Sequence, residues 1–180
     1  MEIPDAETCF YNSIKGDSGS MVQRNIEIAE LIPVIQDVVS DGGCFRMRGG
    51  GWSMLPFIRD QDEIIVTSLK NRNIRVGDIL FYIRDDGTYV IHRVFAKKAE
   101  EIYSFVGDNQ RDIEKGIHKS QILFYVKEVV RNGKVYNCEK GIIRWIMTFY
   151  MFIRIRYPFV AYRFLLPCLN QILHNREMTQ

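Results

Sequence analysis

Short β-rich runs follow one another from residue 44 to residue 137, and turn residues separate them. Asp86-Gly87 and Asn132-Gly133 are dipeptides typical of two-residue hairpin loops. Several short strands joined by tight turns predict a mainly antiparallel β core. The runs expected to form strands are 44–49, 63–67, 79–84, 88–95, 102–106, 122–130 and 134–137.

Helical patterns flank this central region, so the predicted fold class is mainly β with added helices (α+β). The apolar positions from Asn25 to Val39 recur with a helical period, and Pro33 is expected either to kink that helix or to mark the first turn of a shorter one. Asp41-Gly42-Gly43 ends the segment. We predict a flexible N-terminal arm (1–24), a β domain with a leading helix (25–140) and a helical tail (141–180).

Length and charge exclude some classes of protein. The chain has 180 residues, which corresponds to one domain with a core that needs no disulfide. Lys and Arg total 24 and Asp and Glu total 22, so the net charge of +2 gives no support for nucleic-acid binding. The segment before Gly43 contains a single helical run and is too short for a helix-turn-helix. We expect no nucleic-acid partner.

The cysteines are Cys9, Cys44, Cys138 and Cys168, and no pair has C-x-x-C spacing. Zinc, iron–sulfur and thioredoxin-type sites therefore find no support. The N-terminal residues lack the basic and apolar regions of a signal peptide, and no stretch reaches 18 uncharged apolar residues. The expected location is the cytoplasm, with peripheral attachment to the cytoplasmic face of a membrane as an extension of that prediction.

The tail differs in composition from the rest of the chain. Residues 141–173 contain no acidic side chain, four arginines and eight aromatic side chains. Two interpretations remain open. The segment either forms helices that pack on the β core, or lies in the plane of a lipid surface, where arginines meet headgroups and aromatic rings sit at the boundary.

The first motif that could carry chemistry is the glycine-rich stretch 49–56. Its glycines allow a sharp turn that presents Ser53, and Pro56 fixes the backbone just after it. Backbone N–H groups at Gly51, Trp52, Ser53 and Met54 are candidates for an oxyanion site. The alternative is an ordinary Gly/Ser/Pro turn.

The second motif is His92, which lies in the apolar run 89–94. If Asp86-Gly87 is the loop centre, His92 faces Phe81 in the middle of the hairpin. Imidazole suits a general base at neutral pH, so activity is expected to fall below about pH 6–7. The alternative is a hydrogen-bonded structural histidine, the role that we assign to His118 and His174.

The third motif is the carboxylate-rich turn 105–112. Asp108 or Asp112 is a candidate to orient the imidazole and stabilise its charged form, and the alternative is a polar Asx turn. Asp78 precedes a predicted strand and is expected to be structural.

Together the motifs G-x-S-M-x-P, V-G-D-I-L-F-Y, I-H-R-V and G-D-N occur in an order that resembles the signal peptidase I and repressor-cleavage superfamily of serine peptidases (S24–S26 type). The resemblance covers about Phe45 to Asn137. It implies a coiled antiparallel β-sheet and cleavage of peptide bonds without metal or cofactor. It places the nucleophile at Ser53.

The base position distinguishes the branches of that superfamily. Bacterial signal peptidases and self-cleaving repressors use lysine, whereas the endoplasmic-reticulum and archaeal-type enzymes use histidine, which His92 resembles. In that branch Asp108 matches the aspartate of the G-D-N box, and Asp112 is the nearest match to a second aspartate.

These observations predict a serine endopeptidase that cleaves a leader or signal segment by Ser–His acyl transfer, with the substrate bound as an extended strand. Residues 141–173 are the candidate contact with lipid. The alternative is an inactive domain of the same fold that binds peptides or membranes. The presence of both Ser53 and His92 favours the enzyme.

Overall fold

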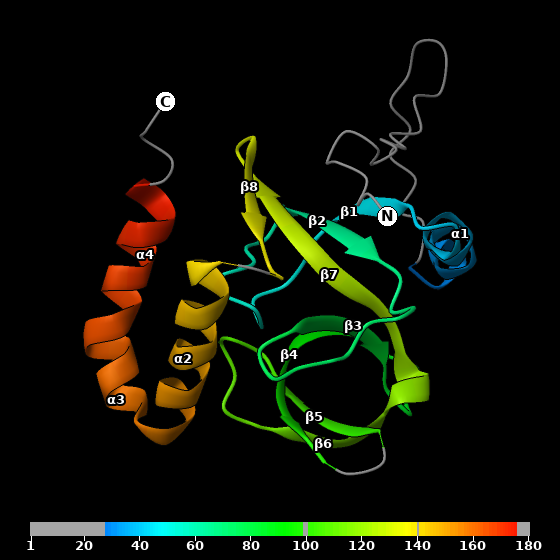
Figure 1. The fold of residues 1–180 in the computed structure, drawn as a ribbon. Helices are drawn as coiled ribbons and strands as arrows, with labels where there is room; N and C mark the ends of the chain where they lie inside the picture. The colour runs from blue at the N-terminus through cyan, green and yellow to red at the C-terminus, as the bar shows by residue number, and fades with distance from the viewer. Residues whose placement is uncertain (1–27, 99–100, 140, 176–180) are drawn as a thin grey trace.

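The computed structural model describes residues 28–98, 101–139 and 141–175. Figure 1 shows one twisted sheet with helix α1 beside one end and a helical tail beside the other. The elements, in chain order, are α1 (Ile28–Ser40), β1 (Cys44–Arg48), β2 (Glu63–Thr67), β3 (Ile79–Ile83), β4 (Tyr89–Lys97), β5 (Ile102–Val106), β6 (Glu114–His118), the short helix η2 (Lys119–Gln121), β7 (Ile122–Arg131), β8 (Lys134–Asn137), α2 (Ile142–Arg156), α3 (Pro158–Val160), the π-helical segment η3 (Ala161–Leu165) and α4 (Leu166–Asn175).

The sheet is antiparallel throughout, with the strand order β1-β2-β7-β3-β4-β5-β6 and with β8 paired to β7. The long strand β7 joins its two halves, because Tyr125 pairs with Thr67 of β2 and also with Leu80 of β3. Strands β3 to β6 curl round on themselves (Figure 1). The expected mainly β, α+β fold is confirmed.

Each run expected from the sequence forms a strand, but β6 was missed. The sequence predicts a polar turn over residues 105–112 and no strand between residues 106 and 122. In β6 only Ile117 is buried, and Gly116 has a positive φ of 85°. This edge strand therefore lacks the apolar alternation that reveals a half-buried strand. His118 is its last residue and is exposed.

The register of the β3–β4 hairpin differs by one residue from the expectation. His92 pairs with Leu80, and Phe81 pairs with Ile91. The Arg84 N–H donates to the Thr88 carbonyl at 2.9 Å, so the loop holds three residues and not two. Gly87 closes that loop with a φ of 83°, a conformation that glycine adopts without strain.

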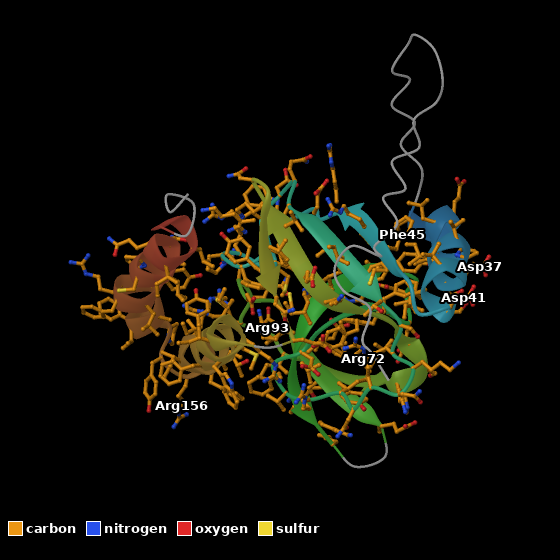
Figure 2. All side chains as sticks on the ribbon, turned by 45° about the horizontal axis from the view of Figure 1, so that its top comes forward. Asp37, Asp41, Phe45, Arg72, Arg93 and Arg156 are labelled. Carbon is orange, nitrogen blue, oxygen red and sulfur yellow. The ribbon has the colours of Figure 1, made fainter. Side chains whose placement is uncertain are left out.

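Helix α1 covers one face of the sheet with the apolar stripe that its period predicts. Its buried residues are Ile32, Ile35 and Val39, while Asp37 and Asp41 lie on the outer side (Figure 2). The described helix continues through Pro33 to Ser40. The predicted arm (1–24) and the first residues of the predicted helix lie outside the described residues.

The tail forms helices that pack on the β core, as one of the two interpretations predicts. Ile143, Met147 and Tyr150 of α2 enter the same core cluster as Phe81 and Phe124. The Arg144 guanidinium of α2 also forms a buried ion pair with Asp78 at 3.2 Å, which gives Asp78 a structural contact. In the described ranges, no helix combines the length and the apolar character needed to cross a membrane.

Candidate active site

Ser53 lies in a turn that is fixed by backbone hydrogen bonds and by buried side chains on either side of it. The Gly49 N–H donates to the Asp62 carbonyl at 2.7 Å, and the Phe57 and Ile58 N–H groups donate to the Met54 carbonyl at 3.0 and 2.9 Å. The side chains of Met54 and Ile58 are buried. Because both ends of the turn are fixed, the half-buried Ser53 is held at a set position on its surface.

The G-D-N segment supports this turn through the backbone. The Asn109 N–H donates to the Ser53 carbonyl at 2.7 Å. A Cβ at Gly107 would lie 2.5 Å from the same carbonyl oxygen, so only glycine allows the two segments to approach this closely. The G-D-N segment therefore positions the nucleophile turn.

Asp108, the acidic residue of that segment, is paired with Arg93. Its carboxylate accepts hydrogen bonds from Arg93 Nε at 2.7 Å and from Nη2 at 2.6 Å, and both side chains are buried. Arg93 also donates to the Gly77 carbonyl at 2.9 Å. Two parallel hydrogen bonds of this kind satisfy both charges. The Arg93–Asp108 ion pair therefore joins the G-D-N segment to β4.

His92 faces a different set of side chains, which we call the histidine network: His92, Tyr82, Glu114 and Arg84. His92 Nδ1 lies 3.1 Å from Tyr82 Oη, which donates to Glu114 Oε2 at 2.7 Å. Glu114 also accepts two bonds from Arg84, each of 2.8 Å. The carboxylate itself is 3.9 Å from Nδ1.

This network assigns the tautomer of the imidazole. The single hydroxyl proton of Tyr82 goes to Glu114, so Tyr82 Oη accepts from Nδ1–H. The other ring nitrogen of His92, Nε2, is then an acceptor. A general base needs an unprotonated nitrogen of this kind, because that nitrogen must accept a proton.

The environment sets the charge of these groups. Burial lowers the pKa of His92 from 6.5 to about 4, although the charge of Glu114 acts in the opposite direction. Burial raises the pKa of the Tyr82 hydroxyl, and its hydrogen bond to Glu114 adds to the effect. Burial alone would raise the pKa of Glu114, but the bonds from Arg84 and Tyr82 outweigh it and the pKa is lowered. At neutral pH, His92 is therefore neutral and Glu114 is charged.

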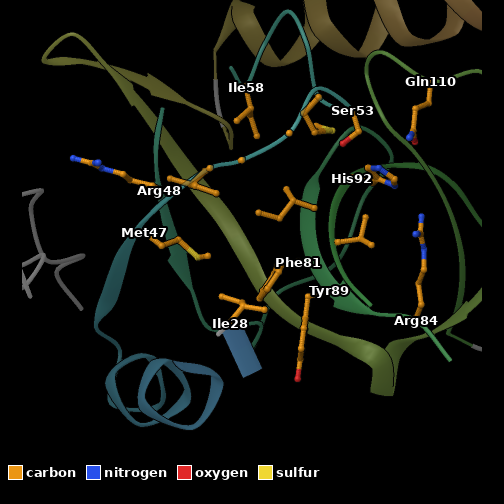
Figure 3. A pocket seen from close by; sticks show the side chains of 17 residues that line it. Ile28, Met47, Arg48, Ser53, Ile58, Phe81, Arg84, Tyr89, His92 and Gln110 are labelled. Carbon is orange, nitrogen blue, oxygen red and sulfur yellow. The ribbon is translucent and has the colours of Figure 1, made fainter. Parts of the chain in front are cut away.

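Ser53 and His92 line the same groove, which has a volume of about 440 Å³. Figure 3 shows the two side chains at one end of this groove, together with Gln110. Within the described part of the chain, no hydrogen bond joins the two side chains. Such bonds are often long before substrate arrives. The Ser53 and Met54 N–H groups also have no acceptor among the described residues, and so are available to an oxyanion.

The groove has apolar walls and two strand edges. β1 is the last strand of the sheet, and its Met47 and Arg48 line the groove. Residues 89–92 of β4 pair with β3 on one side only, because pairing with β5 begins at Arg93. The other lining side chains include Ile28, Ile58, Ile64, Phe81 and Ile91. An extended peptide has both backbone partners and apolar contacts here.

The structure corrects the expected partner of the imidazole. Asp108 binds Arg93, and Asp112 is exposed with no hydrogen bond or ion pair to His92. Tyr82 and Glu114 take that place, and the sequence analysis named neither. The available signal was weak: Glu114 follows the same acidic turn, but only the fold of β6 brings it to Tyr82.

The other residues singled out from the sequence lie as follows. Gly51 lines the groove with a φ of 88°, and Trp52 is 78% exposed beside Ser53. His174 lies in α4, outside the site. Among residues 28–98, 101–139 and 141–175, no group of three or more His, Cys, Asp or Glu side chains could hold a metal ion.

Comparison with known proteins agrees with this geometry. A family profile described as Peptidase S24-like matches residues 9–117, a range that includes the Ser53 turn and the whole histidine network. Residues 118–180, with β7, β8 and the helical tail, lie outside the match. A search of the curated proteins found no significant match. The match spans more than half of the chain, and the protein therefore belongs to the Peptidase S24-like family, within the S24/S26 peptidase superfamily.

Proposed function

We propose that this protein is a serine endopeptidase in which Ser53 is the nucleophile and His92 is the general base. The observation that carries the proposal is the shared groove: Ser53 and His92 line its wall, and the histidine network leaves Nε2 of His92 as an acceptor. Family membership supports a peptidase relationship, while catalysis by these two residues is the part that we infer.

The proposed reaction is acyl transfer. Ser53 Oγ attacks the carbonyl carbon of the scissile bond, and His92 Nε2 takes the hydroxyl proton. The Ser53 and Met54 N–H groups stabilise the oxyanion, and His92 then gives its proton to the leaving amine. In deacylation His92 removes a proton from water, which attacks the ester carbonyl; the ester bond breaks, the acid product leaves, and His92 returns the proton to Ser53 Oγ. Each time the imidazole becomes charged, Tyr82 and the Glu114 carboxylate stabilise it.

The proposed substrate is an extended peptide with apolar side chains near the scissile bond, as in a leader or signal segment. The strand edges at Met47-Arg48 and Tyr89-His92 offer backbone hydrogen bonds, and the apolar lining favours aliphatic side chains. Charged side chains at the same positions would lose hydration without gaining a partner.

A serine-directed fluorophosphonate probe and a mixed peptide library test the proposal. We expect the native protein to be labelled and to cleave, and Ser53→Ala to do neither. Labelling or cleavage that persists in Ser53→Ala would reject Ser53 as the nucleophile. Peptide binding to the native protein without labelling or turnover would instead support the alternative, an inactive peptide-binding domain.

A further inference from the structure

The helical tail carries an exposed aromatic face. Trp145 and Phe149 of α2 are 69% and 60% exposed, and Phe152 continues their stripe one turn later. Their spacing places them on one side of α2, opposite the buried Met147 and Tyr150. The hairpin between α2 and α4 carries further exposed rings, Phe159, Tyr162 and Phe164. We define the aromatic face as Trp145, Phe149 and Phe152, which share one side of α2.

The charged side chains of the tail itself have one sign. From Gly141 to Asn175 the sequence contains no acidic residue. Arg144 and Arg154 are buried and bind Asp78 and the Gln110 carbonyl, so they belong to the fold. Arg156 and Arg163 are exposed. Arg156 continues the stripe of α2 and lies at the outer side of the tail, away from the sheet (Figure 2).

We propose that the aromatic face binds in the plane of an anionic lipid bilayer, with Arg156 and Arg163 at the headgroups. Exposed aromatic rings on one helix face insert at the boundary between headgroups and acyl chains, and arginines beside them attract anionic lipids. A stripe of large exposed aromatic side chains on one helix face is typical of an interaction site.

The charge pattern favours lipid over a second copy of this chain. In a symmetric dimer through this face, each subunit would bring the same arginines, and residues 141–175 contain no acidic side chain to pair with them. Like charges would then meet without partners, which is unfavourable at a protein interface. An anionic bilayer supplies the missing negative charge.

The contact would also orient the groove. Arg154 of α2 donates to the carbonyl of Gln110, which lines the groove, and the Phe152 ring lies 5.4 Å from that of Phe95 in β4. Lipid binding through α2 would therefore hold the groove at a fixed orientation to the bilayer. Only this step, which directs the peptidase to substrates at a membrane surface, rests on the proposed function.

Cosedimentation of the full chain with vesicles tests the lipid contact without any activity measurement. We expect binding to vesicles that contain phosphatidylglycerol, and at least about 10-fold weaker binding to pure phosphatidylcholine. Arg156→Gln with Arg163→Gln should reduce the affinity for anionic vesicles by about 30-fold, because each arginine near the surface contributes about 1 kcal/mol. Trp145→Ser with Phe149→Ser should remove binding to both kinds of vesicle.

Two matched controls separate this face from general surface effects. Lys70→Gln with Lys98→Gln removes two exposed charges elsewhere, and Val34→Ser removes an exposed apolar side chain of α1. Both should bind as the native protein does. In a Trp52→Phe background, the emission of Trp145 should shift to the blue with anionic vesicles. Circular dichroism establishes that each variant is folded.

The proposal is overturned if the native chain does not cosediment with anionic vesicles, or if the arginine variant and its lysine control lose affinity equally. A dimer in analytical ultracentrifugation that disappears in Trp145→Ser with Phe149→Ser would also overturn it, in favour of a second copy. Vesicle binding by a chain that cleaves no peptide would uphold the lipid contact and count against the proposed function alone.

Discussion

His92 and Arg93 are neighbours on β4, yet they point to opposite faces of the sheet and meet carboxylates of different kinds. Arg93 forms two direct bonds to Asp108, and both side chains are sealed from solvent. His92 is hydrogen-bonded to Glu114 through the Tyr82 hydroxyl, with the carboxylate itself 3.9 Å away, and Glu114 binds the partly exposed Arg84. The Arg93–Asp108 ion pair thus fixes the geometry of the site, whereas the histidine network adjusts the proton affinity of His92.

The comparison shows why a carboxylate in a conspicuous motif need not serve the reaction. Asp108 lies in the G-D-N segment, but it acts on the backbone that carries Ser53. Glu114 lies in the edge strand β6, which has no recognisable motif. Its carboxylate nevertheless lies close to His92 Nδ1. The experiments below separate the two roles.

The largest expected effect is on stability, in Asp108→Asn. This change leaves the Arg93 guanidinium buried without its counter-charge, and loss of one partner of a buried pair costs about 3–5 kcal/mol. Urea denaturation measures the free energy of unfolding. Asp112→Asn is the matched control, because the exposed Asp112 should change it by less than about 0.5 kcal/mol. A stable Asp108→Asn variant that had lost cleavage would place Asp108 in the reaction and not in the fold.

Tyr82→Phe should have the largest effect on turnover within the histidine network. It leaves the buried Nδ1–H of His92 without an acceptor and breaks the connection to Glu114. A hydrogen bond to a charged group contributes about 1.5–3 kcal/mol, and the variant loses this bond when the imidazole becomes charged, so we expect kcat to fall by about 10- to 100-fold. Steady-state cleavage of a library-derived peptide gives this value. If kcat is unchanged while KM rises, Tyr82 contributes to substrate binding and not to the base.

Glu114→Gln should have a smaller effect, because a glutamine oxygen can still accept the Tyr82 proton while the negative charge is lost. We expect kcat to fall by about 10-fold, and the acid limb of the pH profile to move to lower pH, since Glu114 raises the pKa of His92. Glu101→Gln, which removes an exposed carboxylate paired with Lys119, is the control and should leave both unchanged. Equal effects of the two changes would exclude a specific role for Glu114.

The pH dependence of kcat/KM should show the smallest effect, but it directly compares a buried His92 with a solvated one. Burial lowers the pKa of His92 to about 4, so kcat/KM should stay flat from pH 8 to about pH 5 and fall below it. The sequence alone predicted a fall at about pH 6–7, from the ordinary pKa of imidazole. A limb at that higher pH would mean that His92 is solvated when it acts.

The titration of His92 also makes the free energy of unfolding depend on pH. Between pH 6.5 and about 4 the unfolded chain binds a proton at His92 and the folded chain does not. The contribution of His92 to the free energy of unfolding is therefore constant above pH 6.5 and decreases as the pH falls through this window. In His92→Gln that part of the pH dependence should disappear, as urea denaturation at several pH values would show.

The sequence by itself determined every strand except β6, the antiparallel pairing and the two motif residues, because alternation of apolar side chains and turn chemistry act over a few neighbouring residues. It placed the strands at 63–67 and 102–106 at the bounds found, and it singled out Ser53 and His92, which line one groove. The tertiary structure alone decided the rest. The contact of Tyr82 with Glu114 depends on the pairing of β5 with β6, which includes a register shift. The low pKa of His92 depends on how deeply the fold buries the ring, and burial is a property of the folded chain as a whole.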